Sequence, residues 1–281
     1  MILQWLEYIR CPALTAVFSA FSFLGESLTL TAAVMLVYWL AAGRTGEKLA
    51  LIALTSLPLN VGLKHAVSRP RPYAAGVVSR VDVDNFFVST EGLGDALSFP
   101  SGHAQASASF LTGTGAAVKR AWAWAVCALV VFLIMLSRLY LGVHYPSDVL
   151  AGFALGVAVA LLWELIYARW YRFRFYALAL LAALSLLPLL FACPRDMVQA
   201  AGLLSGAAVF LPFADALQRG REAVSFPRRL WRVPAGALAA GAVYALSLLF
   251  PEGEAFDLLF YFLLAGAATL GAQALFRLFR I

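Results

Sequence analysis

The chain has 281 residues, of which 63% are apolar and 13% are charged. A typical soluble domain is about 45–50% apolar and about 25% charged, so this composition excludes an ordinary soluble enzyme, a secreted disulfide scaffold and a disordered segment. The formal net charge is +6. Basic residues of a lipid-embedded chain gather in its cytoplasmic loops, so we predict membrane lipids and no nucleic acid as partners.

Apolar stretches long enough to cross a bilayer recur along the chain. A transmembrane helix needs about 20 apolar residues, and residues 12–24 are too short, which predicts an interfacial or re-entrant helix there. The expected fold class is all-α, a polytopic transmembrane helical bundle of about nine spans. The spans are expected at residues 27–43, 49–67, 99–118, 121–139, 148–168, 175–193, 197–217, 233–250 and 255–276.

Small residues and cysteines add little chemistry of their own. Gly152 and Gly156 form a G-x-x-x-G pattern in the fifth predicted span, which indicates close helix packing inside the chain or, as the alternative, a helix-dimer face. No pair of the three cysteines forms a C-x-x-C motif, which excludes zinc ribbons and redox motifs. Cys11 and Cys193 are able to pair if both lie on the outer face, and this question stays open, as does homo-oligomerisation.

The charged residues divide between the two faces when the loops are numbered alternately. One face collects most of the arginines, and the other face holds most of the carboxylates. By the positive-inside rule the arginine-rich face is cytoplasmic. The C-terminus is then expected in the cytoplasm and the N-terminus outside it, in a multi-pass protein of the cell membrane. The arginine-rich face carries Arg44, Lys48, Lys119, Arg120, Arg169, Arg172, Arg174, Arg219, Arg221, Arg228, Arg229, Arg232, Arg277 and Arg280.

Three polar segments share the outer face. Lys64 ends the second predicted span, and Arg71 follows it. His103 opens the third span within Pro-Ser-Gly-His, while Arg138 and His144 lie between the fourth and fifth spans. Intramembrane cations are costly at about 2.5–3.5 kcal/mol each at mid-span. Three cations that converge therefore require a compensating anionic ligand.

The residue types in these segments suit a tetrahedral oxyanion. Ser101 and Gly102 stand at a helix start, where free backbone N–H groups and the positive end of the helix dipole attract anions. The cations Lys64, Arg71 and Arg138 add charge and hydrogen-bond donors. We therefore predict a phosphate pocket formed by these five residues.

Two histidines and one carboxylate supply the reactive groups. His144 and Asp148 are four positions apart, so the carboxylate is able to hold one ring nitrogen and leave the other free to attack phosphorus. His103 then remains as general acid for the departing oxygen and as general base for water. This arrangement predicts a phosphohistidine intermediate.

The motifs K-x₆-R-P, P-S-G-H and S-R-x₅-H-x₃-D resemble the three signature motifs of the type-2 phosphatidic acid phosphatase (PAP2) superfamily. The resemblance covers residues 27–168 and implies a metal-independent phosphoric ester hydrolase without cofactors. It implies His144 as nucleophile, Asp148 as its orienter and His103 as acid and base. We accordingly predict an N-terminal segment at 1–26, a catalytic core at 27–168 and further transmembrane helices at 169–281. Nine spans resemble the glucose-6-phosphatase branch, and hydropathy argues against the soluble vanadium haloperoxidases.

The loop at residues 73–97 is the longest polar stretch predicted outside the membrane. Its acidic residues and its aromatic pair suit either a lid over the substrate or a solvated loop that rests on the bilayer. They are Asp82, Asp84, Phe86, Phe87, Glu91 and Asp95. Arg69, just before this loop, is interpreted as a solvated charge, with neutralisation of phosphate as the alternative. Tyr73 is interpreted equally well as a pocket residue or a structural one.

The expected function is that of an integral membrane phosphatase acting at the extracytoplasmic face. The expected substrate is a phosphomonoester or pyrophosphate of a lipid. A sugar phosphate is the alternative substrate, and a lipid phosphotransferase is the alternative reaction. A carrier that binds a phosphorylated ligand without turnover is the alternative from a different class.

Overall fold

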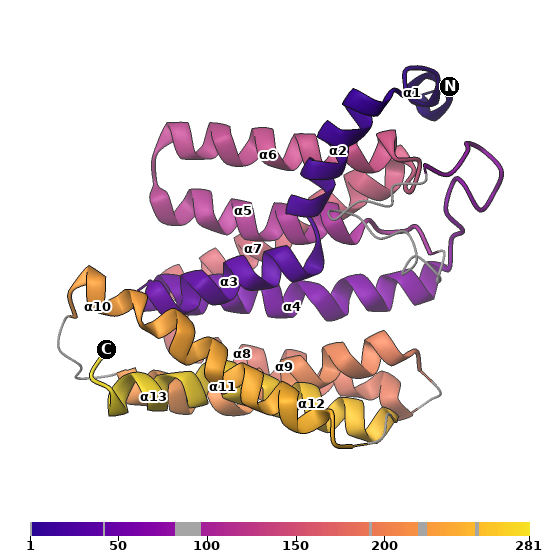
Figure 1. Cartoon of the computed structure of the whole chain (residues 1–281). Helices are drawn as coiled ribbons and strands as arrows, with labels where there is room; N and C mark the ends of the chain where they lie inside the picture. Colours follow the sequence, from indigo (N-terminus) through magenta and orange to yellow (C-terminus); the bar gives the residue numbers. More distant parts are fainter. Residues whose placement is uncertain (1, 42, 82–96, 191–192, 219–223, 251–252) are drawn as a thin grey trace. The chain divides into compact units, whose positions relative to one another are not determined.

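The computed structural model describes residues 2–41, 43–81, 97–190, 193–218, 224–250 and 253–281. Within these ranges the structure is helical apart from turns, extended connections and an isolated antiparallel bridge between Pro70 and Leu97. This confirms the all-α prediction (Figure 1). The elements are α1 (Ile2–Tyr8), α2 (Pro12–Leu24), α3 (Ser27–Leu40), α4 (Arg44–Val67), α5 (Gly102–Val118), α6 (Ala121–Tyr140), α7 (Pro146–Arg169), η1 (Tyr171–Phe173), α8 (Arg174–Leu186), η2 (Leu187–Leu190), α9 (Arg195–Gln218), α10 (Phe226–Leu230), α11 (Arg232–Ser247), α12 (Glu254–Gly266), η3 (Ala267–Gly271) and α13 (Ala272–Leu278).

Every predicted span falls on a helix, but the helices differ in length. Among the described residues, six segments are long and apolar enough to cross a membrane, and a seventh is counted if α2 and α3 form one span bent by 47°. The predicted spans on α5 and α11 correspond to helices of 17 and 16 residues. The multi-pass membrane bundle is therefore established, and the count of nine spans stays a prediction.

The helices form two compact units that interleave along the sequence. Unit 1 comprises Met1–Ala33 and Leu59–Glu164, and unit 2 comprises Val34–Pro58 and Leu165–Ile281. Helices α3, α4 and α7 therefore each contribute residues to both units. The functional division at residues 26 and 168 is a different partition and remains a prediction.

In unit 1, α5 and α6 lie side by side in opposite directions (Figure 1). The turn between them begins at Lys119, whose φ of 57° ends α5 in the left-handed conformation. Helix α7 approaches α5 through its glycine pair, because a Cβ atom on Gly152 would lie 2.5 Å from the Ser101 carbonyl oxygen and one on Gly156 would lie 2.9 Å from the Ala108 Cβ. The G-x-x-x-G pattern thus serves packing inside the chain.

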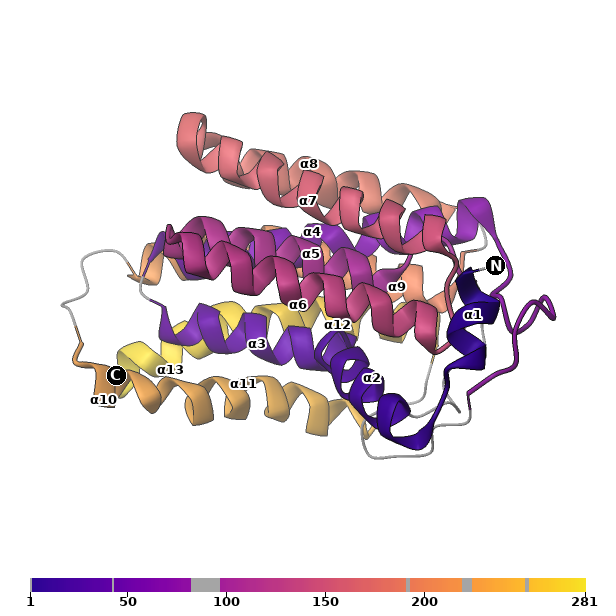
Figure 2. The same ribbon diagram turned by 90° about the horizontal axis from the view of Figure 1, so that it is seen from above.

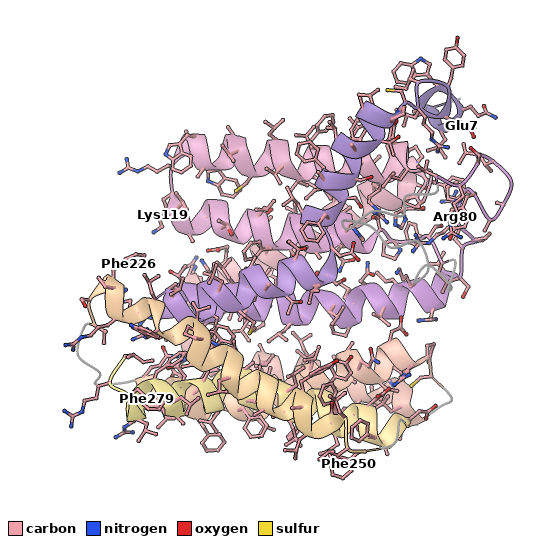
Figure 3. The ribbon with its side chains drawn as sticks, viewed as in Figure 1. Glu7, Arg80, Lys119, Phe226, Phe250 and Phe279 are labelled. Atoms are coloured by element: carbon pink, nitrogen blue, oxygen red, sulfur yellow. The ribbon has the colours of Figure 1, made fainter. Side chains whose placement is uncertain are left out.

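The two ends of unit 1 carry different residues. Lys119 lies at one end, and Glu7 and Arg80 lie at the other (Figure 3). Figure 2 shows α1 at that second end, beside the segment that follows α4. Arg10, just after α1, donates hydrogen bonds to the Tyr140 carbonyl oxygen at 3.1 Å and to the Ser79 carbonyl oxygen at 2.9 Å. Through these hydrogen bonds, the N-terminal residues are held at the end of unit 1 where the sequence motifs meet.

In unit 2, a second glycine pair brings two helices together. A Cβ atom on Gly202 of α9 would lie 2.7 Å from the Leu258 carbonyl oxygen of α12, and one on Gly206 would lie 2.9 Å from the Ala265 Cβ. Small residues thus allow the helix backbones to approach closely, as is common in membrane bundles. Phe226 and Phe279 lie at one end of unit 2, and Phe250 lies at the other (Figure 3).

Unit 2 also buries charged groups. Arg174, which is only 3% exposed, pairs with Glu47 and with Asp215, at 2.9 Å from the latter carboxylate. Buried charges are tolerated when they are paired. Because the three residues come from α4, α8 and α9, their ion pairs join these helices. All three cysteines are free thiols in this structure.

Candidate active site

The three sequence motifs meet at one end of unit 1. Helix α4 ends just before Ser68, whose φ of 49° turns the chain out of the helix. The Ser98 N–H then donates to the Arg69 carbonyl oxygen at 2.7 Å, and the Ser98 hydroxyl donates to the Pro70 carbonyl oxygen at 3.2 Å. These bonds hold the residues after α4 against the residues before α5, so the first two motifs become neighbours.

The ring of His144 is held by a backbone carbonyl group. Its Nδ1 lies 2.8 Å from the Ser98 carbonyl oxygen, and because a carbonyl oxygen only accepts, Nδ1 carries the proton. The nearest Asp148 carboxylate oxygen lies 3.7 Å from Nδ1, which is too far for a direct hydrogen bond. The hydrogen bond that the ring was expected to donate to Asp148 is therefore replaced by one that it donates to the Ser98 carbonyl oxygen. Asp148 acts on the ring through its charge, and Nε2 is left unprotonated.

Asp148 is itself fixed on both carboxylate oxygens. The Tyr145 N–H donates to Oδ2 at 2.8 Å, and Arg69 donates to Oδ1 at 3.0 Å. Arg69 also donates to the Ser147 hydroxyl at 2.7 Å and stacks on the Tyr145 ring at 3.8 Å. The interpretation of Arg69 as a solvated loop charge is therefore wrong, because its guanidinium group positions the carboxylate beside His144.

Two predicted phosphate ligands are buried and incompletely paired. Arg71 is 6% exposed and Arg138 is 3% exposed. Within the described part of the chain, Arg71 Nε and Nη1 and Arg138 Nε have no hydrogen-bond partner. Arg138 Nη1 donates to the Ser22 hydroxyl of α2. Leaving buried charged donors unsatisfied is expensive, so these nitrogens suit an anionic ligand. Lys64, which was predicted alongside them, lies half-buried in the last turn of α4.

The start of α5 differs in one detail from expectation. The Ser101 N–H was predicted to face phosphate, but it donates to the Asp148 carbonyl oxygen at 3.0 Å and ties α5 to α7. The Ser101 hydroxyl caps the helix by accepting from the Ala104 N–H at 3.4 Å. Gly102 is the first residue of α5, and the first N–H groups of a helix have no partner within it. Of the two residues, Gly102 therefore retains the backbone group suited to an oxyanion.

Two polar residues of unit 1 support this helix start. Asn60 of α4 donates to the Gln105 side-chain oxygen at 2.9 Å, and its own side-chain oxygen would lie 3.2 Å from a Cβ atom on Gly102. The ring of His103 contacts Glu26 at 3.1 Å between Nε2 and Oε2. Neither Asn60 nor Glu26 is among the site residues that the sequence motifs predict. The signal for both was present, because polar residues within apolar stretches of a membrane protein mark functional or pairing sites.

The electrostatic setting of His144 favours its neutral form. Burial lowers the pKa of His144, and the positive charges of Arg138 and Arg71 act in the same direction, whereas Asp148 opposes them. Burial also lowers the pKa of Arg71. The site thus combines a neutral imidazole with buried guanidinium groups, which is the combination needed to attack an anionic ester.

Some of the predicted features lie beyond what the structure describes. Among the described residues, no group of three or more histidine, cysteine or acidic side chains is arranged to hold a metal ion.

Tyr73 packs against the buried cluster of Tyr140, Leu141 and Val143, which accords with its structural interpretation. The loop residues Asp82, Asp84, Phe86, Phe87, Glu91 and Asp95 lie outside the described ranges, so the lid hypothesis stays a prediction.

Two phosphatases are similar to part of this chain. The chain is 34% identical over 121 residues to a decaprenylphosphoryl-5-phosphoribose phosphatase of Mycobacterium tuberculosis, covering 43% of this chain and 56% of that protein. It is 36% identical over 110 residues to a lipid A 1-phosphatase of Rhizobium etli, covering 38% of this chain and 44% of that protein. The matches thus span about half the length of these relatives.

A solved structure and a family model extend the comparison. The crystal structure of a transmembrane PAP2 type phosphatidylglycerolphosphate phosphatase from Bacillus subtilis matches with a TM-score of 0.51 at 25% identity. The match covers 60% of this chain and 84% of that one. The model of the PAP2 superfamily matches residues 45–174, a range that contains all three motifs. Over these residues the chain matches the PAP2 superfamily.

Proposed function

We propose that this chain is an integral membrane phosphatase that hydrolyses a lipid phosphomonoester or pyrophosphate through a phosphohistidine intermediate. The observation that carries the proposal is the set of guanidinium nitrogens on buried Arg71 and Arg138 that have no hydrogen-bond partner among the described residues, and the charges of these arginines act on the neutral ring of His144. A phosphate group satisfies these donors and neutralises their charge. Lys64, the hydroxyl proton of Ser101 and the backbone N–H of Gly102 complete the proposed phosphate-binding set.

The first chemical step forms a bond between His144 and phosphorus. His144 Nε2 attacks while the bond from phosphorus to the leaving oxygen breaks, and that oxygen takes both the bonding electrons and a proton from His103. The Ser98 carbonyl oxygen holds the Nδ1 proton at 2.8 Å and so keeps Nε2 available. Asp148 stabilises the positive charge that the ring acquires, and the arginines stabilise the oxygens of the phosphoryl group in flight.

The second step releases inorganic phosphate. His103, now neutral, takes a proton from water, and the water oxygen bonds to phosphorus. The bond from phosphorus to Nε2 breaks, and its electron pair returns to the His144 ring. Uncatalysed hydrolysis of phosphate monoesters is among the slowest known reactions, so division into two stabilised steps meets a large catalytic demand.

A lipid substrate is favoured by the surroundings of the site. The chain lies in the membrane, and the relatives reported above are named as phosphatases of a decaprenyl-linked sugar phosphate, of lipid A and of phosphatidylglycerolphosphate. We place the site on the extracytoplasmic face and the C-terminus in the cytoplasm, because arginines concentrate at the opposite ends of the predicted spans.

The proposal is tested by a phosphate-release panel on purified full-length protein in detergent. Phosphatidic acid, phosphatidylglycerophosphate, undecaprenyl diphosphate and glucose 6-phosphate are offered side by side. We expect release from at least one lipid and a loss of at least about 10³-fold in kcat for His144→Ala, because no other group forms the covalent bond. Release from glucose 6-phosphate alone would replace the lipid assignment, and a fully active His144→Ala variant would contradict the mechanism.

A further inference from the structure

The end of helix α2 reaches the active site although it lies outside the residues that define the superfamily match. Ser22 accepts a hydrogen bond from Arg138 Nη1. A Cβ atom on Gly25 would lie 2.8 Å from the Ile134 side chain and 3.2 Å from His103 Cδ2. The helix stops at this glycine, and the chain bends by 47° into α3. Absence of a side chain at Gly25 lets this bend lie directly against His103.

The bend directs one carboxylate group at the His103 ring. Glu26 Oε2 lies 3.1 Å from His103 Nε2. Within the part of the chain that the structure describes, this is the hydrogen bond that the ring makes. The His103 side chain is 17% exposed, whereas the Glu26 side chain is 44% exposed. The Glu26 carboxylate is therefore more exposed than the half-buried ring that it contacts.

We propose that Glu26 is a positioning residue that orients His103 and stabilises its protonated form, so that Nδ1 delivers the proton to the leaving oxygen. The proposal rests on the hydrolase function proposed above. A general acid must carry its proton at the moment of bond cleavage. The charged and titratable groups that act on His103 are Arg138, Arg71, His144 and Glu26, and the two arginines oppose a second positive charge. The carboxylate supplies the compensating negative charge at hydrogen-bond distance.

The role predicts a dependence on the leaving group. An alkyl ester needs a proton on its departing oxygen, whereas p-nitrophenolate leaves readily as an anion. Glu26→Gln keeps a similar shape and a hydrogen-bonding group but removes the charge. We expect this variant to lose about tenfold in kcat/KM on dioctanoyl phosphatidic acid and less than about twofold on p-nitrophenyl phosphate. A purely structural defect would lower both rates to the same extent.

The experiment compares wild type, Glu26→Gln, His103→Ala and the double variant, with Glu254→Gln as control because Glu254 is an exposed acid of unit 2. If Glu26 acts through His103, adding Glu26→Gln to His103→Ala changes the rate on the alkyl ester by less than about twofold. Additive losses, or equal losses on the two esters, overturn the role of Glu26. If wild type hydrolyses a different lipid of the panel above, the same variants are compared on that lipid. If wild type releases phosphate from none of these substrates, the hydrolase proposal fails, and this inference fails with it.

Discussion

The ring of His144 shows how one hydrogen bond changes the expected roles around it. The sequence spacing predicts that Asp148 holds the ring, but the Ser98 carbonyl oxygen lies at 2.8 Å and the carboxylate at 3.7 Å. A backbone carbonyl group fixes the tautomer without adding charge. The carboxylate is free to act through its charge and is held in place by Arg69. The tautomer and the charge are thus controlled by different groups.

This separation leads to a prediction for Asp148→Asn. Because Ser98 still holds the Nδ1 proton, we expect a loss of about 10²-fold in kcat, smaller than the loss for His144→Ala. Burial already lowers the pKa of His144, and Asp148 opposes that shift. Removal of the carboxylate therefore lowers the pKa further.

The direction in which pH changes the rate of phosphate release depends on which protonation form of His144 attacks phosphorus. In the proposed mechanism the neutral ring of His144 is the nucleophile, so activity is expected to be lost as pH falls through the pKa of His144. The acid limb of kcat/KM in wild type is expected below pH 6.5, about the ordinary value for histidine, and at still lower pH in Asp148→Asn. The measurement is the pH profile of phosphate release. An acid limb that moves to higher pH in the variant contradicts the assigned role of Asp148.

At the scale of elements, close approach of α5 and α7 brings two motifs together. The glycine pair of α7 lets the backbones meet, and the Ser101 N–H then reaches the Asp148 carbonyl oxygen at 3.0 Å. Without that approach, the start of α5 and the start of α7 would separate. Packing of small residues along the helices therefore sets the geometry of the catalytic groups at their ends.

We accordingly expect Gly152→Ala to disturb both stability and activity. Its Cβ atom would lie 2.5 Å from the Ser101 carbonyl oxygen, and overpacking of this kind costs about 1–3 kcal/mol. The matched control is Gly241→Ala on α11, where no atom lies within 4 Å of the added Cβ. Thermal unfolding in detergent and phosphate release are measured on both variants. If the midpoint of thermal unfolding and the rate of phosphate release are both unchanged in Gly152→Ala, then the helices separate without a cost in stability or activity, and this prediction is wrong.

At the scale of the whole molecule, the chain contains a second compact unit. Most residues of unit 2 lie outside residues 45–174, which match the PAP2 superfamily model. Unit 2 has its own helix packing through Gly202 and Gly206 and its own buried ion pairs around Arg174. Unit 1 holds the motif residues described above. The chemistry and the additional helices are thus assigned to different parts of the chain.

Membrane orientation is the property of the whole molecule that is most directly testable. We expect a cysteine at Ala75, near the site, to react with a membrane-impermeant maleimide in intact cells. A cysteine at Arg120, in the turn between α5 and α6, should react only after permeabilisation. Both substitutions are made in a Cys11→Ser, Cys193→Ser background, because Cys127 is buried. The reverse labelling pattern would invert the topology that the positive-inside rule predicts.

Much of this protein is determined by the order of residue types alone. Apolar runs in the sequence specify a helical membrane bundle because lipid leaves backbone groups no partner outside a helix. The spacing of Lys64, Arg71, His103, Arg138, His144 and Asp148 identifies the superfamily. Their gathering at one face also follows from alternation of the predicted spans.

Tertiary structure decided what local patterns do not encode. The contacts of Ser98 with His144, of Arg69 with Asp148 and of Glu26 with His103 join residues separated by 46, 79 and 77 positions. Such pairs depend on how helices pack and where loops turn, and no periodicity in the sequence records this. The sequence therefore names the reactive groups, and the packing of the helices determines which partners control their protons and charges.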